Sequence, residues 1–313
     1  IWGPVIAGLS LSSLGFAPHY SVLILLLILG GLGLATFHPE AAALTTSLSG
    51  QRRTWRMSVF MLGGNMGFSL GPFLILAVVI NLGLKWSFFA SLPALGTAWV
   101  LYRYALLGEN APKIHSSSNI NIESSLNRRV LGFSVLLSLV VLRVTTVLSL
   151  VTFLPMVQKL RGFSLMAAGG SMTVFMACGA FGGLIGGYLA DRVGRKKMIH
   201  ASFLLALPAL SAFLYWKGPI SLFILALLGF LLYISEPSCI VLAQEMIPQQ
   251  ARTASGLIMG MAWGLGGGGV LGVGALADAF GIEWALRFLL FLPAGALILS
   301  FFLPSETIDK PRV

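Results

Sequence analysis

Apolar residues fill this chain in ten long runs that short polar segments separate. The runs cover residues 2–17, 21–37, 57–80, 86–107, 130–156, 165–190, 198–216, 219–245, 254–280 and 284–304. They are about as long as a helix must be to cross the ~30 Å hydrocarbon core of a bilayer. Glycine and proline inside them are tolerated better in membrane helices than in soluble ones. The pattern predicts an all-α polytopic membrane protein with about ten transmembrane helices.

One polar break is longer than the others and divides the runs into four and six. It extends from Gly108 to Arg129 and contains Asn110, Pro112 and three consecutive serines. A segment of this composition reads as a flexible linker. We therefore predict the remainder of an N-terminal helix bundle at residues 1–107, a linker at 108–129 and a six-helix bundle at 130–313.

Composition and charge narrow the class of protein further. Hydrophobic residues make up 57% of the chain and charged residues only 10%, with a net charge of +10. The basic residues lie between the apolar runs rather than on one face, so they indicate membrane topology and no nucleic-acid partner. Cys178 and Cys239 lie inside apolar runs, where small buried hydrophobes are expected rather than a disulfide framework or a metal site.

The lysines and arginines divide unequally when alternate loops are assigned to alternate sides of the membrane. One side collects Arg52, Arg53, Arg56, Lys113, Arg128, Arg129, Arg192, Arg195, Lys196, Lys197, Arg252, Lys310 and Arg312. The other side collects Lys85, Lys159, Arg161, Lys217 and Arg287. The positive-inside rule places the larger set, with the linker and the C-terminus, in the cytoplasm. We therefore expect an integral multi-pass protein of the cell membrane.

An internal repeat relates the two parts of the chain. A shift of 198 aligns Gly31 with Gly229, Pro39 with Pro237 and Gly71 with Gly269, and a shift of 197 aligns Gly63, Gly67 and Gly71 with Gly260, Gly264 and Gly268. Two like halves are typical of secondary transporters. The first-half equivalents of spans 130–156 and 165–190 would fall upstream of Ile1. We therefore expect two further spans before Ile1 and twelve spans, six plus six, in the intact protein.

The most charged segment of the chain is Gly-Tyr-Leu-Ala-Asp-Arg-Val-Gly-Arg-Lys-Lys at residues 187–197. Topology alone would need positive charge, but not an acid and two glycines at fixed spacing. Gly187 permits close helix contact, Gly194 permits a tight turn, and Asp191 can accept hydrogen bonds from the N-terminus of a neighbouring helix.

This segment resembles the G-x-L-A-D-R-x-G-R-K/R-x loop of the major facilitator superfamily. Residues 37–40 with 63–67, and 242–245 with 254–257, resemble the fosmidomycin-resistance branch, whose members are proton-coupled drug efflux proteins. The resemblance implies a 6+6 helix bundle and a conformational latch that holds the cytoplasmic side closed in the outward-facing state. The latch residues that it implies are Gly187, Asp191, Arg192, Gly194, Arg195 and Lys196.

Four polar side chains in or at the ends of the apolar runs are candidates for binding substrate or protons. Arg143 lies about 20 Å into its span, where a charge needs a partner or a cavity. Glu236 lies in the cytoplasmic third of its own span, so the sequence does not establish a bond between the two. His38 occupies the repeat position of Glu236, and each either carries protons or marks a helix end. Asn65 is a candidate for lining the central cavity.

Glycines recur at four-residue spacing in three spans. The three ridges are Gly63, Gly67 and Gly71; Gly179, Gly183 and Gly187; and Gly260, Gly264 and Gly268. Small residues at this spacing predict close helix packing. The sequence does not distinguish fixed packing from sliding of one helix on another.

Together these features predict a monomeric secondary active transporter of a small drug-like or anionic compound. That it exports this compound in exchange for protons is implied by the resemblance to the fosmidomycin-resistance branch alone. The chain has no G-x-x-x-x-G-K-[ST] phosphate-binding loop, so we expect a proton gradient as the energy source and no cofactor. An importer of a sugar, metabolite or inorganic anion is the first alternative. An intramembrane enzyme would need clustered catalytic side chains, whereas the histidines are scattered, and a channel would not need the repeat and the latch.

Overall fold

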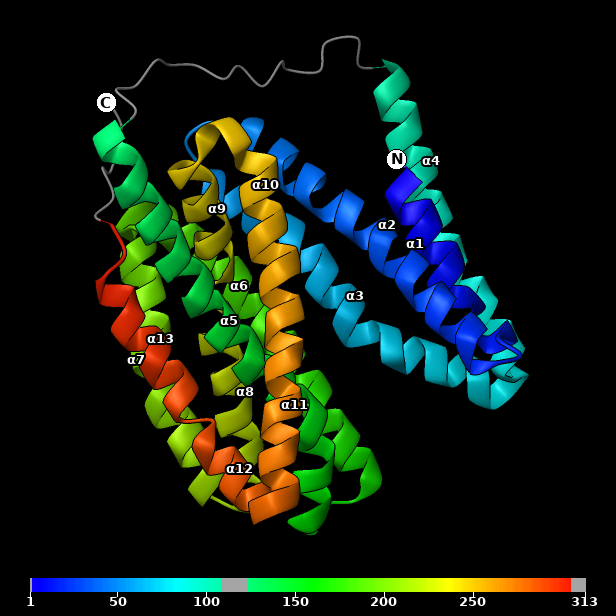
Figure 1. Cartoon of the computed structure of the whole chain (residues 1–313). Helices are drawn as coiled ribbons and strands as arrows, with labels where there is room; N and C mark the ends of the chain where they lie inside the picture. The colour runs from blue at the N-terminus through cyan, green and yellow to red at the C-terminus, as the bar shows by residue number, and fades with distance from the viewer. Residues whose placement is uncertain (1, 108–122, 305–313) are drawn as a thin grey trace.

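The computed structural model describes residues 2–107 and 123–304, and these residues form helices and short turns without a β-strand. The N-terminal group is α1 (Trp2–Ser12), α2 (Tyr20–Ser47), α3 (Arg53–Leu82) and α4 (Leu92–Leu107). The C-terminal group is α5 (Glu123–Leu160), α6 (Leu165–Val193), α7 (Arg195–Tyr215), α8 (Ile220–Tyr233), α9 (Glu236–Met246), α10 (Ala251–Gly256), α11 (Ala262–Phe280), α12 (Ile282–Phe288) and α13 (Phe291–Phe301). Figure 1 shows them as two bundles.

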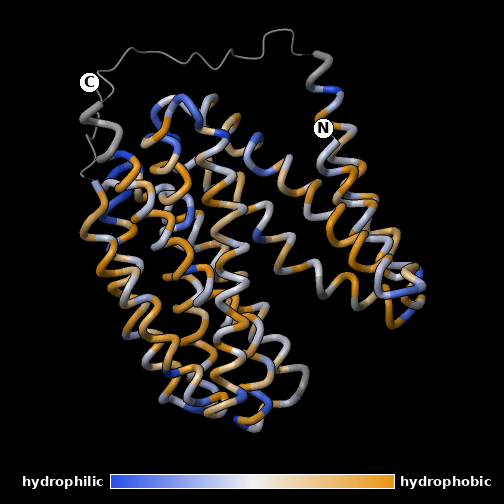
Figure 2. Tube along the Cα trace, viewed as in Figure 1, coloured by the Kyte–Doolittle hydropathy of each residue, from blue (hydrophilic) through white to orange (hydrophobic). Residues whose placement is uncertain are grey.

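The helices have the length and the surface of membrane spans. Seven helical stretches among the described residues are long and apolar enough to cross a bilayer. Apolar residues run along most of each helix (Figure 2), and many large ones, such as Leu25, Leu32 and Phe223, are exposed. Exposed apolar surface of this extent is suited to lipid. The chain is an integral membrane protein with an all-α bundle fold.

Several predicted runs are helical but interrupted. The run at 219–245 is divided into α8 and α9, the run at 284–304 into α12 and α13, and a π-helical turn at Leu257–Met261 precedes α11. The predicted linker at 108–129 overlaps α5, which begins at Glu123; the earlier part of that linker lies outside the described residues. Apolar runs predict where the chain spans the membrane. They do not predict where a helix is interrupted, because an interruption depends on the loss of single backbone hydrogen bonds, which hydropathy does not measure.

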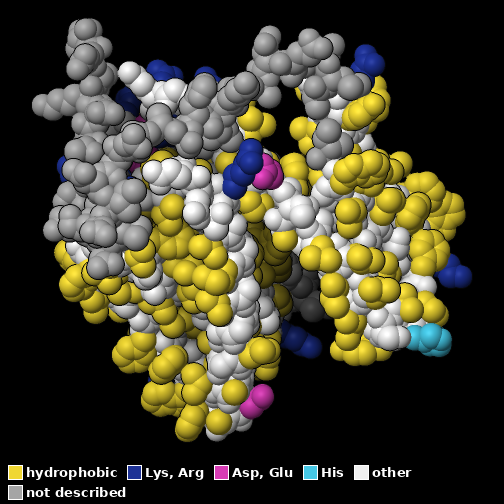
Figure 3. Space-filling model, turned by 45° about the horizontal axis from the view of Figure 1, so that its top comes forward, with side chains coloured by type: hydrophobic (Ala, Val, Ile, Leu, Met, Phe, Trp, Pro, Cys, Tyr) yellow, Lys and Arg dark blue, Asp and Glu magenta, His cyan; other side chains and the backbone are white. Residues whose placement is uncertain are grey.

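The two bundles touch at one end of the molecule, which we call the latch end because the segment 187–197 lies there. α3 packs on α6 and α9, and α2 packs on α10. The opposite end, which we call the far end, carries the turn between α5 and α6 and the turn between α7 and α8. The bundles diverge there in Figure 1, and the space-filling view shows a hollow between them (Figure 3).

The glycines of two predicted ridges lie on uncovered helix faces, which differs from the close packing that their spacing predicts. A Cβ atom added at any glycine of two predicted ridges would meet no atom within 4 Å; these glycines are Gly63, Gly67, Gly71, Gly260, Gly264 and Gly268. The third ridge does pack closely, since an added Cβ would lie 2.6 Å from the Tyr233 ring at Gly179 and 2.4 Å from Ser58 Oγ at Gly187. At Gly183 the nearest atom, the Tyr233 carbonyl oxygen, is 3.6 Å away. Glycines at four-residue spacing predict a helix face without side chains, but they do not predict whether another helix packs on that face.

Candidate functional site

The last turn of α6 joins the two bundles through Asp191. Its carboxylate accepts hydrogen bonds from the backbone N–H groups of Thr54 at 3.1 Å and Trp55 at 2.8 Å. Both donors lie in the first turn of α3, whose N–H groups have no partner within the helix. A carboxylate there also interacts favourably with the positive end of the helix dipole. The structure therefore contains the helix N-terminus contact that the sequence predicts for Asp191.

The two glycines of the loop bring α6 and α3 together and turn the chain. The face of α6 at Gly187 lies directly against Ser58 and the carbonyl of Thr54, so there is no room for a side chain. Ser58 Oγ also donates to the carbonyl of Leu184 at 3.3 Å. Gly194 has a φ of +106°, which L residues rarely adopt, and it ends α6 one residue before α7 begins.

Arg195 connects three helices at the latch. Its Nε donates to Thr54 Oγ1 at 2.9 Å, and its Nη1 lies 2.7 Å from Glu245 Oε2 at the end of α9. Its Nη2 is 3.9 Å from Asp191 Oδ1, and Arg53 of α3 is 3.6 Å from Glu245. Positive and negative charges therefore alternate across the contact between the bundles.

The other two predicted latch residues contact helices of their own bundle. The guanidinium of Arg192 lies 4.3 Å from the ring centroid of Tyr188. Lys196 Nζ donates to the carbonyl of Phe301 at 3.0 Å and to that of Leu303, so it ties α7 to the end of α13. These contacts support the loop from within the C-terminal bundle.

A second charge contact between the bundles lies near the latch. Arg252 of α10 and Glu40 of α2 approach to 3.0 Å, with side chains 59% and 57% exposed. An exposed ion pair stabilises a contact by about 0–1 kcal/mol. We therefore assign the main cross-bundle bonding to Asp191 and Arg195, which are mostly buried.

Deeper in the bundle, three of the predicted candidates meet in one hydrogen-bonded group, which we call the polar triad. Arg143 Nη2 of α5 lies 3.1 Å from Glu236 Oε1, and both side chains are 3% exposed. Asn65 Nδ2 of α3 donates to Glu236 Oε2 at 3.1 Å. Glu236 thus accepts one hydrogen bond from each bundle. Arg143 also lies 5.7 Å from the ring centroid of Tyr233 and 3.5 Å from the carbonyl of Leu232.

The break between α8 and α9 places Glu236 in this group. Pro237 has no N–H to bond to the carbonyl of Tyr233, so the helix is interrupted at Ile234 and Ser235. Glu236 is therefore the first residue of α9. Ser235 is held in turn by the hydroxyl of Ser202, which lies 3.1 Å away. The proline and its neighbours set the carboxylate between α3 and α5.

His38 stands apart from the polar triad. Its Nδ1 is buried and has no hydrogen-bond partner among the described residues, and its ring contacts Phe37 edge-on at 5.5 Å. Although Pro39 follows it, α2 continues from Tyr20 to Ser47, whereas the equivalent Pro237 marks a break. The two halves share a sequence pattern but not this local geometry.

The sequence also contains site residues that we did not predict. Thr54, Ser58 and Phe68 follow helical spacing with Asn65, so one face of α3 provides the seam between the bundles. Phe68 packs edge-on against Trp263 of α11 with ring centroids 6.4 Å apart. This seam extends about 20 Å along α3. The sequence signal for this seam is the helical spacing of the polar residues that begins at the start of α3.

No group of three or more His, Cys, Asp or Glu side chains that could hold a metal ion occurs among the described residues.

Comparisons with known proteins place this arrangement in a family. The model of the Major Facilitator Superfamily matches residues 1–270. The fosmidomycin resistance protein of Escherichia coli (strain K12) is 32% identical over 305 residues, which cover 94% of this chain and 73% of that protein. An uncharacterised MFS-type transporter of Bacillus subtilis (strain 168), YfnC, is 31% identical over 314 residues, covering 95% and 74%.

Solved structures show the same fold at lower identity. A Major Facilitator Superfamily transporter, FucP, in the outward conformation matches with a TM-score of 0.77 at 18% identity, covering 97% of this chain and 82% of FucP. The human organic anion transporter MFSD10 (TETRAN) matches with a TM-score of 0.69 at 15% identity, covering 96% and 76%. At these identities the likeness concerns the arrangement of the helices.

Proposed function

Because this chain belongs to the Major Facilitator Superfamily, a family of membrane transporters, we propose that it exports a small drug-like compound in exchange for protons. Export is supported by the name of its relative, the fosmidomycin resistance protein. The two bundles would alternate around the polar triad, and no resident cofactor takes part. The positive-inside rule predicts that the latch end is cytoplasmic, and with this orientation the described conformation would be outward-facing.

The contacts of the buried Glu236 carboxylate are the observation that supports proton coupling. The carboxylate pairs with Arg143 in its own bundle and accepts a hydrogen bond from Asn65 in the other. A proton on Glu236 removes its charge, so it weakens the ion pair and the charge-assisted hydrogen bond together. The protonation state of one side chain would thus alter the contact between the bundles.

Exchange requires that the proton and the substrate compete for the same site, so that only one of them is bound at a time. A cationic or hydrogen-bond-donating group of the substrate can bind the Glu236 carboxylate only while no proton occupies it. The substrate would reach Glu236 from the hollow between the bundles (Figure 3). Phe68, about one helical turn from Asn65 on α3, is in edge-on contact with Trp263 of α11, and we propose that the substrate passes this pair. Because these rings are apolar, an amphipathic compound with a donor group fits this route.

Arg143 supports a second candidate function. An anionic substrate that binds Arg143 would leave Glu236 without its partner and thereby favour protonation of Glu236. The substrate and the proton would then bind together and move in the same direction. A substrate held by Arg143 through an anionic group is therefore expected with proton symport, whereas a substrate held by Glu236 through a donor group is expected with antiport.

Transport by the purified full chain in proteoliposomes tests the proposal, with fosmidomycin as the first compound. Antiport predicts accumulation when the lumen is more acidic than the medium, and symport predicts it when the medium is more acidic. Glu236→Gln should remove the response to the gradient, while Glu40→Gln, an exposed acid near the latch, should keep it. A response in Glu236→Gln equal to that of the wild type would exclude Glu236 as the coupling site.

A further inference from the structure

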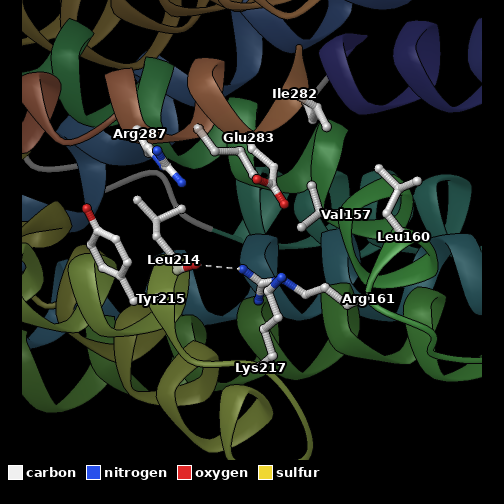
Figure 4. Close-up of a pocket in the computed structure, with 10 residues that line it drawn as sticks. Val157, Leu160, Arg161, Leu214, Tyr215, Lys217, Ile282, Glu283 and Arg287 are labelled. Atoms are coloured by element: carbon white, nitrogen blue, oxygen red, sulfur yellow. Dashed lines mark hydrogen bonds between the residues drawn. The ribbon is translucent and has the colours of Figure 1, made fainter.

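A pocket at the far end of the C-terminal bundle lies away from the polar triad. The ends of α5 and α7 and the start of α12 enclose a volume of about 150 Å³. Its lining combines apolar walls with four charged side chains, three basic and one acidic, that reach it from different elements (Figure 4). These are Arg161, Lys217, Arg287 and Glu283. Along α5, Arg161 is about 27 Å from Arg143, so the two sites are separate.

The basic side chains of this pocket have unused capacity to bind an anion. Within the described residues, none of the four charged side chains forms an ion pair within 4.0 Å. Arg161 Nη2 donates to the carbonyls of Phe213 at 3.0 Å and Leu214 at 3.2 Å, and this fixes the guanidinium. Arg161 Nη1 is buried and has no hydrogen-bond partner there. Leaving such a donor unpaired is costly, so the site favours an added acceptor.

Exposed aromatic residues place the pocket at the depth of the lipid headgroups. Tyr215, Trp216 and Trp284 are 68%, 61% and 63% exposed, and aromatic residues with this exposure at span ends mark the membrane interface. The Arg287 guanidinium lies 4.9 Å from the Trp284 ring and 6.0 Å from the Tyr215 ring, which holds it beside the pocket.

We propose that this pocket binds a phosphate group, either in a lipid headgroup or as free phosphate. Two guanidinium groups and one ammonium group present charged donors from three elements, and arginine binds phosphate oxygens with two parallel hydrogen bonds. The volume of about 150 Å³ has room for a phosphate group. The position among interfacial aromatic residues favours the lipid headgroup as the source.

Glu283 limits the positive charge of the site. Burial lowers the pKa of the Arg161 guanidinium, and the charge of Glu283 raises it. A bound phosphate would add a second negative charge near Arg161. Because Glu283 repels that phosphate, Glu283→Gln should strengthen binding while the basic residues remain in place.

Two measurements on the delipidated, purified protein test the proposal. The first is the shift in melting temperature with inorganic phosphate, against chloride at equal ionic strength. The second is retention of phosphatidylglycerol in native mass spectrometry. Arg161→Gln and Arg287→Gln should each weaken binding about tenfold, since each removes charged donors. Lys159→Gln is the matched control, because Lys159 is exposed on the last turn of α5 and does not line the pocket.

The pattern of results identifies the source. Lipid retention without a response to free phosphate supports a headgroup site, and a response to free phosphate alone supports a soluble ligand. Arg287 is exposed, so Arg287→Gln should stay folded even if Arg161→Gln does not. Binding of neither probe by the wild type, or equal binding by Arg287→Gln and Lys159→Gln, would overturn the proposal.

Discussion

Two carboxylates of the C-terminal bundle receive hydrogen bonds from α3 of the other bundle. Asp191 binds the first turn of α3, and Glu236 binds Asn65 further along the same helix. Asp191 lies at the end of α6, where it is held by Arg195 and by the helix terminus. Glu236 is buried and its bonds depend on its charge. We therefore propose that this seam carries two kinds of contact, a latch at Asp191 and a contact at Glu236 that changes with protonation.

Replacement of Asp191 tests the latch. Asp191→Asn removes the charge that faces the α3 N-terminus, and an interaction of this kind contributes about 1–2 kcal/mol in a partly buried position. We expect normal insertion and a transport rate about fivefold or more lower. The control Asp278→Asn changes an exposed acid at the far end. Membrane expression and transport measured together check this, and wild-type transport by Asp191→Asn would contradict it.

Replacement of Arg143 tests the ion pair separately from transport. Arg143→Met leaves the Glu236 carboxylate buried without its partner, which costs about 3–5 kcal/mol. We expect a clearly lower melting temperature, and recovery of most of it when Glu236→Met is added. Transport should be absent from both variants. Equal melting temperatures for the single and the double variant would show that the pair does not couple the two residues.

The residues of the site could be predicted only in part. Arg143 and Glu236 stand out because charge is rare in apolar runs, and Asp191 stands out by its motif. Their partners could not be assigned, because Thr54 and Asn65 are more than a hundred residues away and only the folded bundle brings them together. His38 shares the repeat position of Glu236, but an unbroken α2 keeps it in a different environment.

At the scale of elements, the break at Ile234 and Ser235 positions Glu236. Pro237→Ala restores the N–H that an unbroken helix needs, so it should favour continuation of α8 into α9 and turn the carboxylate away from Asn65. We expect transport to fall while the melting temperature stays equal or rises. Pro208→Ala, inside α7, is the control. The variant pair is compared by proteoliposome transport and by melting; unchanged transport in Pro237→Ala would contradict this role of the break.

The glycines give a contrast between open and packed helix faces. Gly264→Leu should fold normally, since no atom lies within 4 Å of an added Cβ. We propose that this face of α11 lines the hollow, so the leucine should also reduce transport. At Gly186, an added Cβ would lie 2.1 Å from the carbonyl of Ile234, so Gly186→Ala should cost about 1–3 kcal/mol. Melting curves check both variants. A larger loss of stability in Gly264→Leu than in Gly186→Ala would contradict the assignment.

The ten predicted spans all correspond to helical segments, because long apolar runs in a membrane have few other stable conformations. The packing of the glycine ridges at 63–71 and 260–268 was predicted wrongly for this conformation. A helix face formed by glycines can lie against another helix or against open space. Which of the two occurs depends on how the two bundles are placed relative to each other. Sequence periodicity has no information about that placement.

At the scale of the whole molecule, the bundles are joined at the latch end and separated at the far end (Figure 1). In the alternating-access cycle that we propose, the second state would separate the seam along α3 and close the hollow. Loss of the Asn65–Glu236 contact removes one of the bonds along that seam. Protonation of Glu236 should therefore shift the population toward a conformation with the far end closed.

The distance between the far ends of α3 and α5, measured by double electron–electron resonance, tests this coupling without a substrate. Spin labels at Asn81→Cys and Lys159→Cys, both exposed positions, are placed in a background with Cys178 and Cys239 replaced by alanine. In the wild-type background we expect the distance to shorten as the pH falls, whereas Glu236→Gln should show the short distance at every pH. A Glu236→Gln protein whose distance follows pH as the wild type does would contradict the role of Glu236.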